Sequence, residues 1–422
     1  MTAEWISILV LAGLFVLATV RNVHLGAAAL AAAWVVGTVV FGLPAADIAA
    51  GFPTDLFVTL VGVTLLFAVA EKAGAVGAMV YGAVRLVGGR VSAMPWVVFV
   101  ITAIIAGVGA ATPAAAAIVG PLAMGMAKKY GIHPVLMGMA VIQGASAGSF
   151  GPIGMYGMII NGIVGTSGLP VSPNLLFAAS FVFILLTVVA CFFRFGGLSL
   201  YRRDVADHAE GVSHGGEMER PVFDKDLIAS LVAIVVLAVL AFVYHQHIGF
   251  AALTLTIVLG SAFPSLVKGS VKKIAWPTTL LVTGTVTYIG LLQNQGVVDW
   301  LANSVAAIGV PLLAALVILL IAAVVSALAS TTGILAALVP LAVPFLLTGD
   351  LWVAGVIAAL AISASVVDCS PFSTNGALMI AYTEEPRREA AYKSFFNWGW
   401  ALVVIGPVVS WLLLVVAPTL VR

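Results

Sequence analysis

Long apolar runs separated by short polar segments dominate the chain, and this pattern predicts membrane-spanning helices. A helix of about 20 apolar residues crosses the hydrocarbon core of a bilayer. The runs that fit one crossing lie at 5–20, 25–42, 56–71, 134–163, 174–193, 226–244, 249–266, 277–293, 352–383 and 396–420. The sequence therefore predicts an all-α polytopic membrane protein with about ten transmembrane spans.

Two other apolar stretches, 94–127 and 309–347, are too long for one helix. Small and polar residues interrupt each stretch near its middle. We interpret both as re-entrant hairpins, which enter the membrane and leave it on the same side. Non-helical backbone at membrane depth is tolerated where protein or a water-filled cavity surrounds it.

Two of the predicted spans, 134–163 and 352–383, contain helix breakers and polar residues near their centres. Proline cannot donate a hydrogen bond to the helix ladder, and glycine loosens it. The breakers are Pro152 and Gly157 in the first span and Pro371 and Gly376 in the second. We therefore predict two broken helices at mid-membrane.

Composition agrees with this interpretation. The 422 residues are 62% hydrophobic and 8% charged, whereas a soluble domain has about 25% charged residues. The net charge of +1 gives no reason to expect a nucleic-acid partner. Cys191 and Cys369 lie in apolar surroundings and are predicted to be buried thiols. No metal cluster or nucleophile–base arrangement occurs at the predicted membrane depth, which argues against an enzyme, and no organic cofactor is expected.

The basic residues predict an orientation, because Lys and Arg concentrate in cytoplasmic loops. With the loop after the first span in the cytoplasm, 17 of the 18 Lys and Arg fall on that side, and Arg422 is the exception. Both termini are then extracytoplasmic. We expect a multi-pass protein of the bacterial inner (plasma) membrane.

The two halves of the chain match each other. Pro340 minus Pro121 is 219, and the same offset brings ASAGSFGPIGMYG onto ASVVDCSPFSTNG. We predict a first repeat at 1–193, a flexible cytoplasmic linker at 194–225 and a second repeat at 226–422. The predicted hairpins lie on opposite sides of the membrane, so the repeats are inverted. Inverted repeats with interrupted helices are typical of secondary transporters.

The breaks predict half-helix starts after Thr112, Tyr156, Thr331 and Asn375. Such ends carry unpaired N–H groups and partial positive charge, so they bind anions without a basic side chain. No Lys or Arg lies deep in a predicted span. The candidate substrate-binding residues are Thr112, Ser149, Ser330, Thr331, Thr332, Ser373, Thr374 and Asn375.

Asp368 is the one acid that the pattern places well inside the hydrocarbon. An intramembrane acid indicates function, because its burial is costly. We predict a site for a coupling ion, either sodium or a proton, at Asp368, Ser146, Gly151 and Ser370. Two structural alternatives stay open: the carboxylate caps the second half-helix, and the hydroxyls bond only to their own helices.

At these residues the chain resembles the ion transporter superfamily. The tips Ala111-Thr112-Pro113 and Ser330-Thr331-Thr332 resemble the hairpin tips of divalent-anion:sodium symporters. The segments Asp368–Leu378 and Phe52–Gly74 resemble MatC-type malonate/dicarboxylate carriers more closely. The resemblance implies a homodimer with a scaffold domain and an elevator-type transport domain. It also implies a di- or tricarboxylate substrate held at the tips beside sodium.

The sequence thus predicts a secondary active transporter that imports a small organic dianion, such as malonate or succinate, by symport with sodium or protons. Neither tip carries the Asn of the symporter motif, so one ion near Asp368, or proton coupling, is expected. The alternatives are a sodium/proton antiporter that uses Asp368, an anion channel, and a carrier of a tricarboxylate or another organic anion.

Overall fold

The structure is a computed structural model. It describes residues 3–21, 23–75, 77–78, 81, 90–167, 169–202, 223–242, 244, 246–297, 300, 311–328, 331–347 and 351–421. Helices joined by turns and short loops make up this part of the chain, which contains no strand. The predicted all-α class is confirmed.

The helices of the first half are α1 (Ala3–Arg21), α2 (Leu25–Val35) with the π-helix η1 (Val36–Val40), α3 (Ala45–Ala50), α4 (Thr54–Lys72), η2 (Val91–Ala93), α6 (Met94–Gly107), α7 (Thr112–Lys129), α8 (Pro134–Ser149), α9 (Met155–Thr166) and α10 (Pro173–Arg194). Those of the second half are α12 (Lys225–Phe242), α13 (Ile248–Ala262), α14 (Pro264–Val267), η3 (Ser270–Lys273), α15 (Trp276–Asn294), α17 (Pro311–Leu328), α18 (Thr331–Leu347), α19 (Val353–Ser365), α20 (Thr374–Tyr382), α21 (Glu385–Trp411), η4 (Leu412–Val416) and α22 (Ala417–Val421).

One to three helical elements lie at each of the ten predicted spans. Three helical stretches of the described chain are long and apolar enough to cross a membrane, namely Thr54–Lys72, Pro173–Arg194 and Glu385–Leu420. Other apolar helices have 10–17 residues. The last span differs from expectation, because its helix begins at Glu385 rather than near residue 396 and so adds a polar first turn.

In each of the two predicted broken helices, 134–163 and 352–383, one helix ends and another begins at the interruption. α8 ends at Ser149 and α9 begins at Met155, while α19 ends at Ser365 and α20 begins at Thr374. In each break the loop folds back onto the start of the following helix. A Cβ atom at Gly157 would lie 2.1 Å from the Gly151 carbonyl oxygen, and one at Gly376 would lie 2.0 Å from that of Ser370. Only glycine leaves room for this close approach.

Helix starts in the two halves keep one spacing. α7, α8 and α9 begin at residues 112, 134 and 155, and α18, α19 and α20 begin at residues 331, 353 and 374. The difference is 219 for all three pairs (331 − 112, 353 − 134 and 374 − 155). The offset first read from the prolines therefore also holds for the backbone.

Two helix pairs approach each other closely through glycines. α4 meets α13 where a Cβ atom at Gly62 would lie 2.3 Å from the Gly249 carbonyl oxygen. α2 meets α15 where a Cβ atom at Gly284 would lie 2.0 Å from the Gly26 carbonyl oxygen. Small residues at a crossing let backbones pack directly, which is a common way for helices to associate in membranes.

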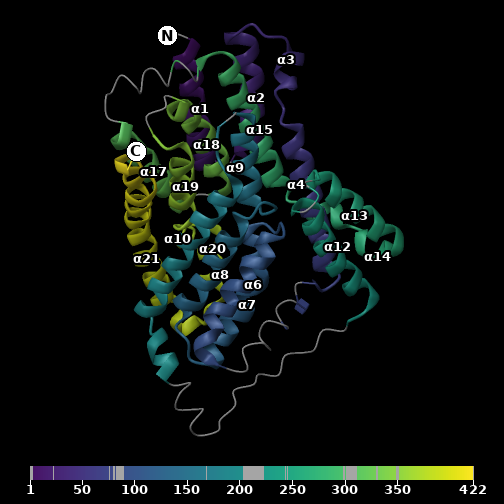
Figure 1. Cartoon of the computed structure of the whole chain (residues 1–422), viewed down its shortest axis with the longest axis vertical. Helices are drawn as coiled ribbons and strands as arrows, with labels where there is room; N and C mark the ends of the chain where they lie inside the picture. The colour runs from purple at the N-terminus through teal and green to yellow at the C-terminus, as the bar shows by residue number, and fades with distance from the viewer. Residues whose placement is uncertain are drawn as a thin grey trace.

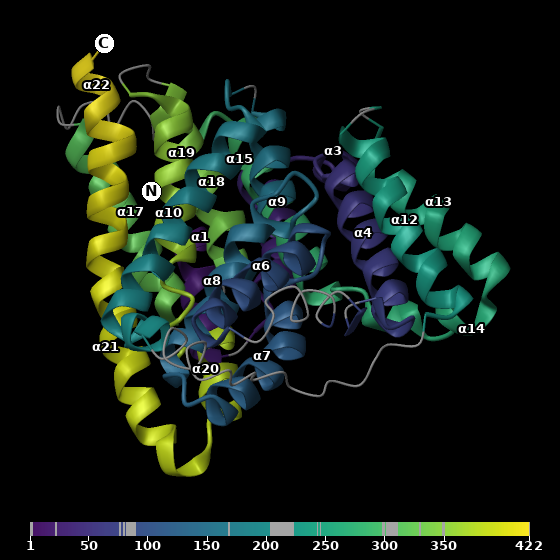
Figure 2. The ribbon, with the colours of Figure 1, turned by 60° about the horizontal axis from the view of Figure 1, so that its bottom comes forward.

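The broken helices lie between two outer sets of helices (Figure 1). α4, α12, α13 and α14 lie at one side, and α17 and α21 lie at the opposite side; the turned view keeps this separation (Figure 2). α8, α9, α19 and α20 lie between them. α6 and α7 lie toward the lower end of the molecule, and α17 and α18 lie toward the upper end (Figure 1). The broken helices thus occupy the middle of the protein.

Candidate functional site

Asp368 lies in the break between α19 and α20, where its side chain is 4% exposed. It is the one buried carboxylate among the described residues. The Asn375 side-chain amide donates a hydrogen bond of 2.7 Å to Asp368 Oδ2. The hydroxyls of Tyr156 and Thr331 are further polar neighbours of this carboxyl group. A buried carboxyl group needs such partners, because isolated burial of charge is strongly unfavourable.

The cap of α20 comes from Ser373 and not from Asp368. The Gly376 backbone N–H donates to Ser373 Oγ over 3.1 Å, and Ser373 Oγ donates in turn to the Asp368 carbonyl oxygen over 2.5 Å. The capping explanation for the intramembrane acid is therefore wrong. The Asp368 side chain faces other side chains instead.

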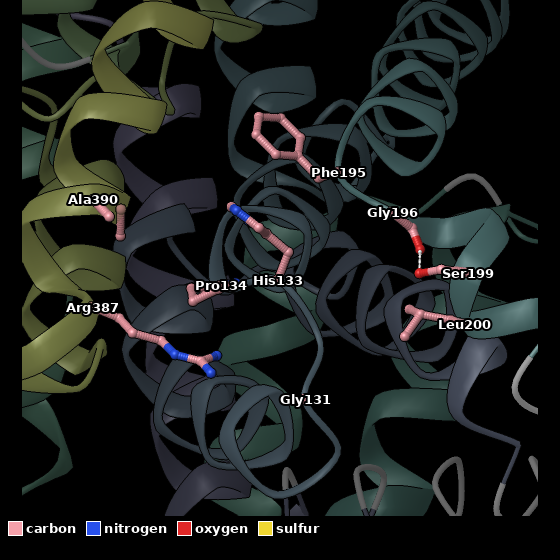
Figure 3. A pocket seen from close by; sticks show the side chains of 10 residues that line it. Gly131, His133, Pro134, Phe195, Gly196, Ser199, Leu200, Arg387 and Ala390 are labelled. Carbon is pink, nitrogen blue, oxygen red and sulfur yellow. Dashed lines mark hydrogen bonds between the residues drawn. The ribbon is translucent and has the colours of Figure 1, made fainter.

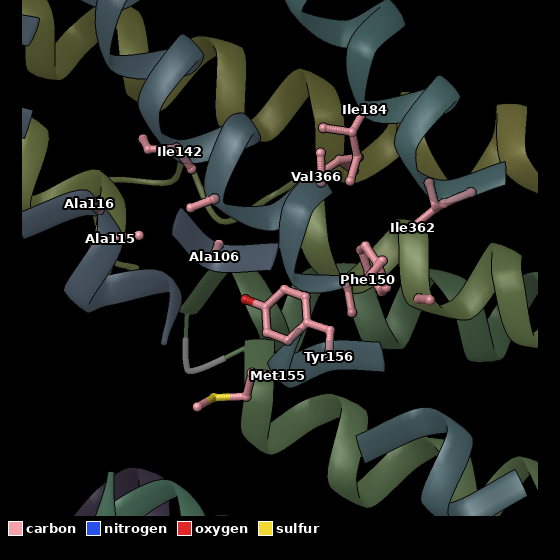
Figure 4. Packing of buried hydrophobic residues seen from close by; sticks show 14 of the residues in the cluster. Ala106, Ala115, Ala116, Ile142, Phe150, Met155, Tyr156, Ile184, Ile362 and Val366 are labelled. Atoms are coloured by element: carbon pink, nitrogen blue, oxygen red, sulfur yellow. The ribbon is translucent and has the colours of Figure 1, made fainter. Parts of the chain in front are cut away.

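The first half of the chain contributes Thr112 and Tyr156 to this cluster. Their side-chain oxygens are 3.1 Å apart, and both residues are buried. Thr112 begins α7 and Tyr156 is the second residue of α9. The Tyr156 ring packs against Phe150, with 5.2 Å between centroids, and its hydroxyl points away from Phe150 (Figure 4). Groups from both halves therefore meet around Asp368.

Tyr156 is a member of the cluster that was not predicted as a site residue. Its repeat counterpart is Asn375, since 156 + 219 = 375, and Asn375 bonds directly to Asp368. That correspondence is the signal that could have identified it. A tyrosine in an apolar helix is usually attributed to packing, and Phe150 does provide packing here.

The second predicted hairpin tip is described from Thr331 onward, and Ser330 lies outside the described residues. Thr331 Oγ1 lies 3.1 Å from Ser326 Oγ and 3.4 Å from the Ala364 carbonyl oxygen. Thr332 is also buried, with 6% of its surface exposed. The start of α18 is thus hydrogen-bonded to the end of α19, next to the second break.

Several buried side-chain oxygens have no hydrogen-bond partner among the described residues; Ser180 Oγ and Ser230 Oγ lie on α10 and α12, and the other four lie on α8 and α20. Those four are Gln143 Oε1, Ser146 Oγ, Ser149 Oγ and Asn375 Oδ1. Gln143 also bridges the halves, because its amide donates to the Val366 carbonyl oxygen over 2.8 Å. Buried polar atoms are nearly always hydrogen-bonded in folded proteins. The oxygens on α8 and α20 are therefore the best candidates to contact a bound ion or substrate.

Three predicted residues are engaged elsewhere or lie apart from the cluster. Ser370 Oγ accepts a hydrogen bond from the Phe372 backbone N–H over 3.3 Å. The Gly151 carbonyl oxygen accepts one from the Gly154 N–H over 2.8 Å. Thr374 is exposed, whereas its neighbours Ser373 and Asn375 are buried.

The site offers no buried basic side chain for an anion among the described residues, so backbone N–H groups at helix starts are the candidates to bind it. No Lys, Arg or His is buried in the described part of the chain. The N-cap residues of α7 and α9, Ala111 and Gly154, form no side-chain cap with the first backbone N–H groups of these helices. Cys191 and Cys369 are buried free thiols, as predicted. No group of His, Cys, Asp and Glu in the described residues could hold a metal by side chains alone.

Residues 1–149 match the family model described as the dicarboxylate carrier protein MatC N-terminus. The resemblance to MatC-type carriers is thereby confirmed for that part of the chain. No curated protein sequence matches the chain significantly.

The chain shares its fold with a solved transporter structure. That structure is described as the crystal structure of the Alcanivorax borkumensis YdaH transporter, which reveals an unusual topology. The similarity has a TM-score of 0.60 at 14% sequence identity and covers 86% of each chain. At this identity it indicates a transporter fold and not a substrate.

Proposed function

We propose that this chain is a secondary active transporter that imports a small dicarboxylate, such as malonate or succinate, by symport with a cation. The match of residues 1–149 to the MatC carrier model and the transporter fold both support a membrane-embedded carrier rather than an enzyme. The buried cluster around Asp368 is the observation that carries the proposal. It combines an acid for a cation with helix starts and hydroxyls for an anion.

In this proposal the cation lies beside Asp368, with the oxygens of Ser146, Ser149 and Asn375 within the same buried region. These oxygens have no hydrogen-bond partner in the described part of the chain, and sodium prefers such hard oxygen ligands. A proton carried by Asp368 is the alternative, since Asn375 and Tyr156 can adjust their hydrogen bonds to either protonation state. The substrate carboxylates would lie at the starts of α7 and α18, next to Thr112, Thr331 and Thr332.

We also propose that the fold consists of two inverted repeats, 1–193 and 226–422, joined by the linker 194–225. The common spacing of 219 for three helix starts supports it. The close helix pairs support it as well, since α2 packs on α15 and α4 packs on α13. A two-fold relation that exchanges α2 with α13 and α4 with α15 would turn one pair into the other. The pairs α6–α7 and α17–α18 at opposite ends of the molecule are placed as inverted re-entrant hairpins would be (Figure 1).

The transport cycle proposed here is of the elevator type in a homodimer. The hairpins and broken helices would move together as a transport domain against the helices with glycine crossings, which serve as the scaffold. We place the protein in the bacterial inner membrane with both termini extracytoplasmic, on the distribution of Lys and Arg.

Uptake of radiolabelled malonate and succinate into proteoliposomes tests the proposal. The vesicles carry an inward sodium gradient, an inward proton gradient, or neither. We expect saturable accumulation under one of the gradients. Accumulation independent of both gradients would contradict symport, and unsaturable flux would indicate a channel. Competition by citrate and benzoate in the same assay would extend the substrate class to tricarboxylates or aromatic acids.

The hydroxyls at the hairpin tips should contribute to substrate affinity. We expect Thr112→Val and Thr331→Val each to raise the apparent KM about fivefold, because one lost hydrogen bond costs about 1 kcal/mol. Initial uptake rates over a range of substrate concentrations measure this. Thr254→Val is the control, since Thr254 bonds to its own helix and is exposed. An unchanged KM in both tip variants would make these hydroxyls structural.

A sodium/proton antiporter of the same fold is the second candidate. Asp368, the one buried carboxylate among the residues that the structure describes, favours it, because cation exchange requires an acid that can titrate. The starts of α7 and α9 without a side-chain cap and the hydroxyls of Thr112, Thr331 and Thr332 favour an anion instead. Sodium-driven proton movement in vesicles without any organic anion would establish the antiporter.

A further inference from the structure

A second polar site lies at the far end of α8 from the buried cluster. A cavity of about 450 Å³ opens where the start of α8, the turn after α10 and the start of α21 meet (Figure 3). The 16 residues of α8 separate the two ends of this helix by about 24 Å. The cavity is therefore distinct from the region around Asp368, and the proposed transport mechanism does not use it.

Arg387 provides the positive charge of the cavity. Its side chain extends into the space between α21 and the α8 start, and it is exposed (Figure 3). No side-chain hydrogen bond or ion pair to Arg387 is formed by the described residues. Two neighbouring acids are already engaged, because Glu384 pairs with Lys128 over 2.5 Å and Glu389 pairs with Lys393 over 2.7 Å. Glu385 is the other carboxylate of this helix turn and is exposed.

His133 supplies a hydrogen-bond donor to the same cavity. Its Nδ1 accepts from the Val135 backbone N–H over 3.3 Å, so the proton of the neutral ring is on Nε2. Partial burial, together with the positive charges of Arg387 and Arg194, holds the pKa of His133 below its ordinary value of 6.5. The ring is therefore neutral at pH 7 and offers an N–H group.

The remaining walls of the cavity are largely apolar. Phe195, Leu200 and Ala390 line it, and Phe195 packs on both His133 and Trp398, with centroid distances of 4.9 and 5.7 Å. A fully hydrated inorganic ion gains little from such walls. A phosphate attached to glycerol and acyl chains matches both the arginine and the apolar surface. Basic pockets between helices at the cytoplasmic face are a known setting for lipid headgroups.

We propose that this cavity binds the phosphate group of an anionic phospholipid. The Arg387 guanidinium contacts the phosphate oxygens, and His133 Nε2–H donates a second hydrogen bond. The glycerol and the first acyl carbons lie against Phe195 and Leu200. A bound lipid joins the ends of α8, α10 and α21, and so links segments from both halves of the chain.

Native mass spectrometry of the full-length protein, titrated with phosphatidylglycerol in detergent, tests this proposal. We expect Arg387→Gln to weaken binding about tenfold, as expected for one charge-assisted contact. His133→Asn should weaken it about threefold, and asparagine preserves the cap of α8. Lys393→Gln is the matched control on the same helix and should bind like the wild type, because its side chain is 70% exposed and paired with Glu389.

The ligand source is distinguished by parallel titrations with phosphatidylcholine, glycerol 3-phosphate and inorganic phosphate. Tighter binding of phosphatidylglycerol than of all three supports the lipid site. If phosphatidylcholine binds as tightly as phosphatidylglycerol, the net negative charge of the lipid headgroup has no role in binding, which would contradict the proposal. Equal binding of either soluble phosphate, sensitive to Arg387→Gln, would overturn the lipid as ligand. Wild-type affinity for phosphatidylglycerol in a folded Arg387→Gln protein would overturn the site itself.

Discussion

Replacing Asp368 by asparagine should reduce gradient-driven uptake about a hundredfold, since loss of an ionic contact of about 3 kcal/mol has that effect. Asparagine fills the same volume and can still bond to Asn375 after the amide groups rotate. The fold should therefore persist while the charge disappears. Initial rates in proteoliposomes under the active gradient measure the loss, and thermal unfolding of the purified protein measures the fold.

The matched control is Asp226→Asn, which makes the same chemical change in the first turn of α12, away from the breaks. It should transport like the wild type. Exchange of internal for external substrate without a gradient provides a second readout. If Asp368→Asn retains exchange but loses accumulation, the carboxylate couples the ion. Accumulation at the wild-type rate would contradict the coupling role of Asp368.

The second large effect is expected at the paired glycines of the two breaks. Gly157→Ala and Gly376→Ala would each place a methyl group about 2 Å from a backbone carbonyl oxygen, that of Gly151 or Ser370. Because the neighbour is backbone, relief requires the break itself to open. We expect each variant to lose about 1–3 kcal/mol of stability and most of its uptake.

Gly165→Ala is the control for this pair, because a Cβ atom there meets nothing within 4 Å and the residue lies on the same helix as Gly157. It should keep both its unfolding temperature and its uptake. Gly157 and Gly376 occupy equivalent positions in the two breaks, so their substitutions should behave alike. Gly157→Ala and Gly376→Ala should have similar effects on stability, and a harmless substitution at either position would contradict the shared geometry of the breaks.

The sequence predicted the positions of these breaks closely. α7 and α18 begin at Thr112 and Thr331, one residue before the expected points, and α9 and α20 begin at Met155 and Thr374, two residues before them. Proline and glycine act locally, so their effect on a helix can be read without tertiary information. The same holds for the repeat, which depends on the spacing of such residues.

The partners of the buried acid could not be predicted in the same way. Tyr156 and Gln143 come from helices that follow one another in sequence, yet they contact groups more than 200 residues away through packing of the two halves. A single sequence carries no direct signal for such a contact. The beginning of α21 was also missed, because the first turns contain charged residues that do not resemble a membrane span.

The charge of the buried cluster has an electrical consequence. It contains one acid and no base among the described residues. If Asp368 moves with the substrate, the site loaded with a dianion carries three negative charges before any cation binds. Each charge that stays uncompensated costs about 2.3 kcal/mol per 100 mV of membrane potential during inward movement. The net charge imported with each dianion equals the number of cations minus two, because Asp368 returns with the empty carrier. Measuring that charge per substrate would therefore count the cations, and three cations would make the loaded step insensitive to voltage.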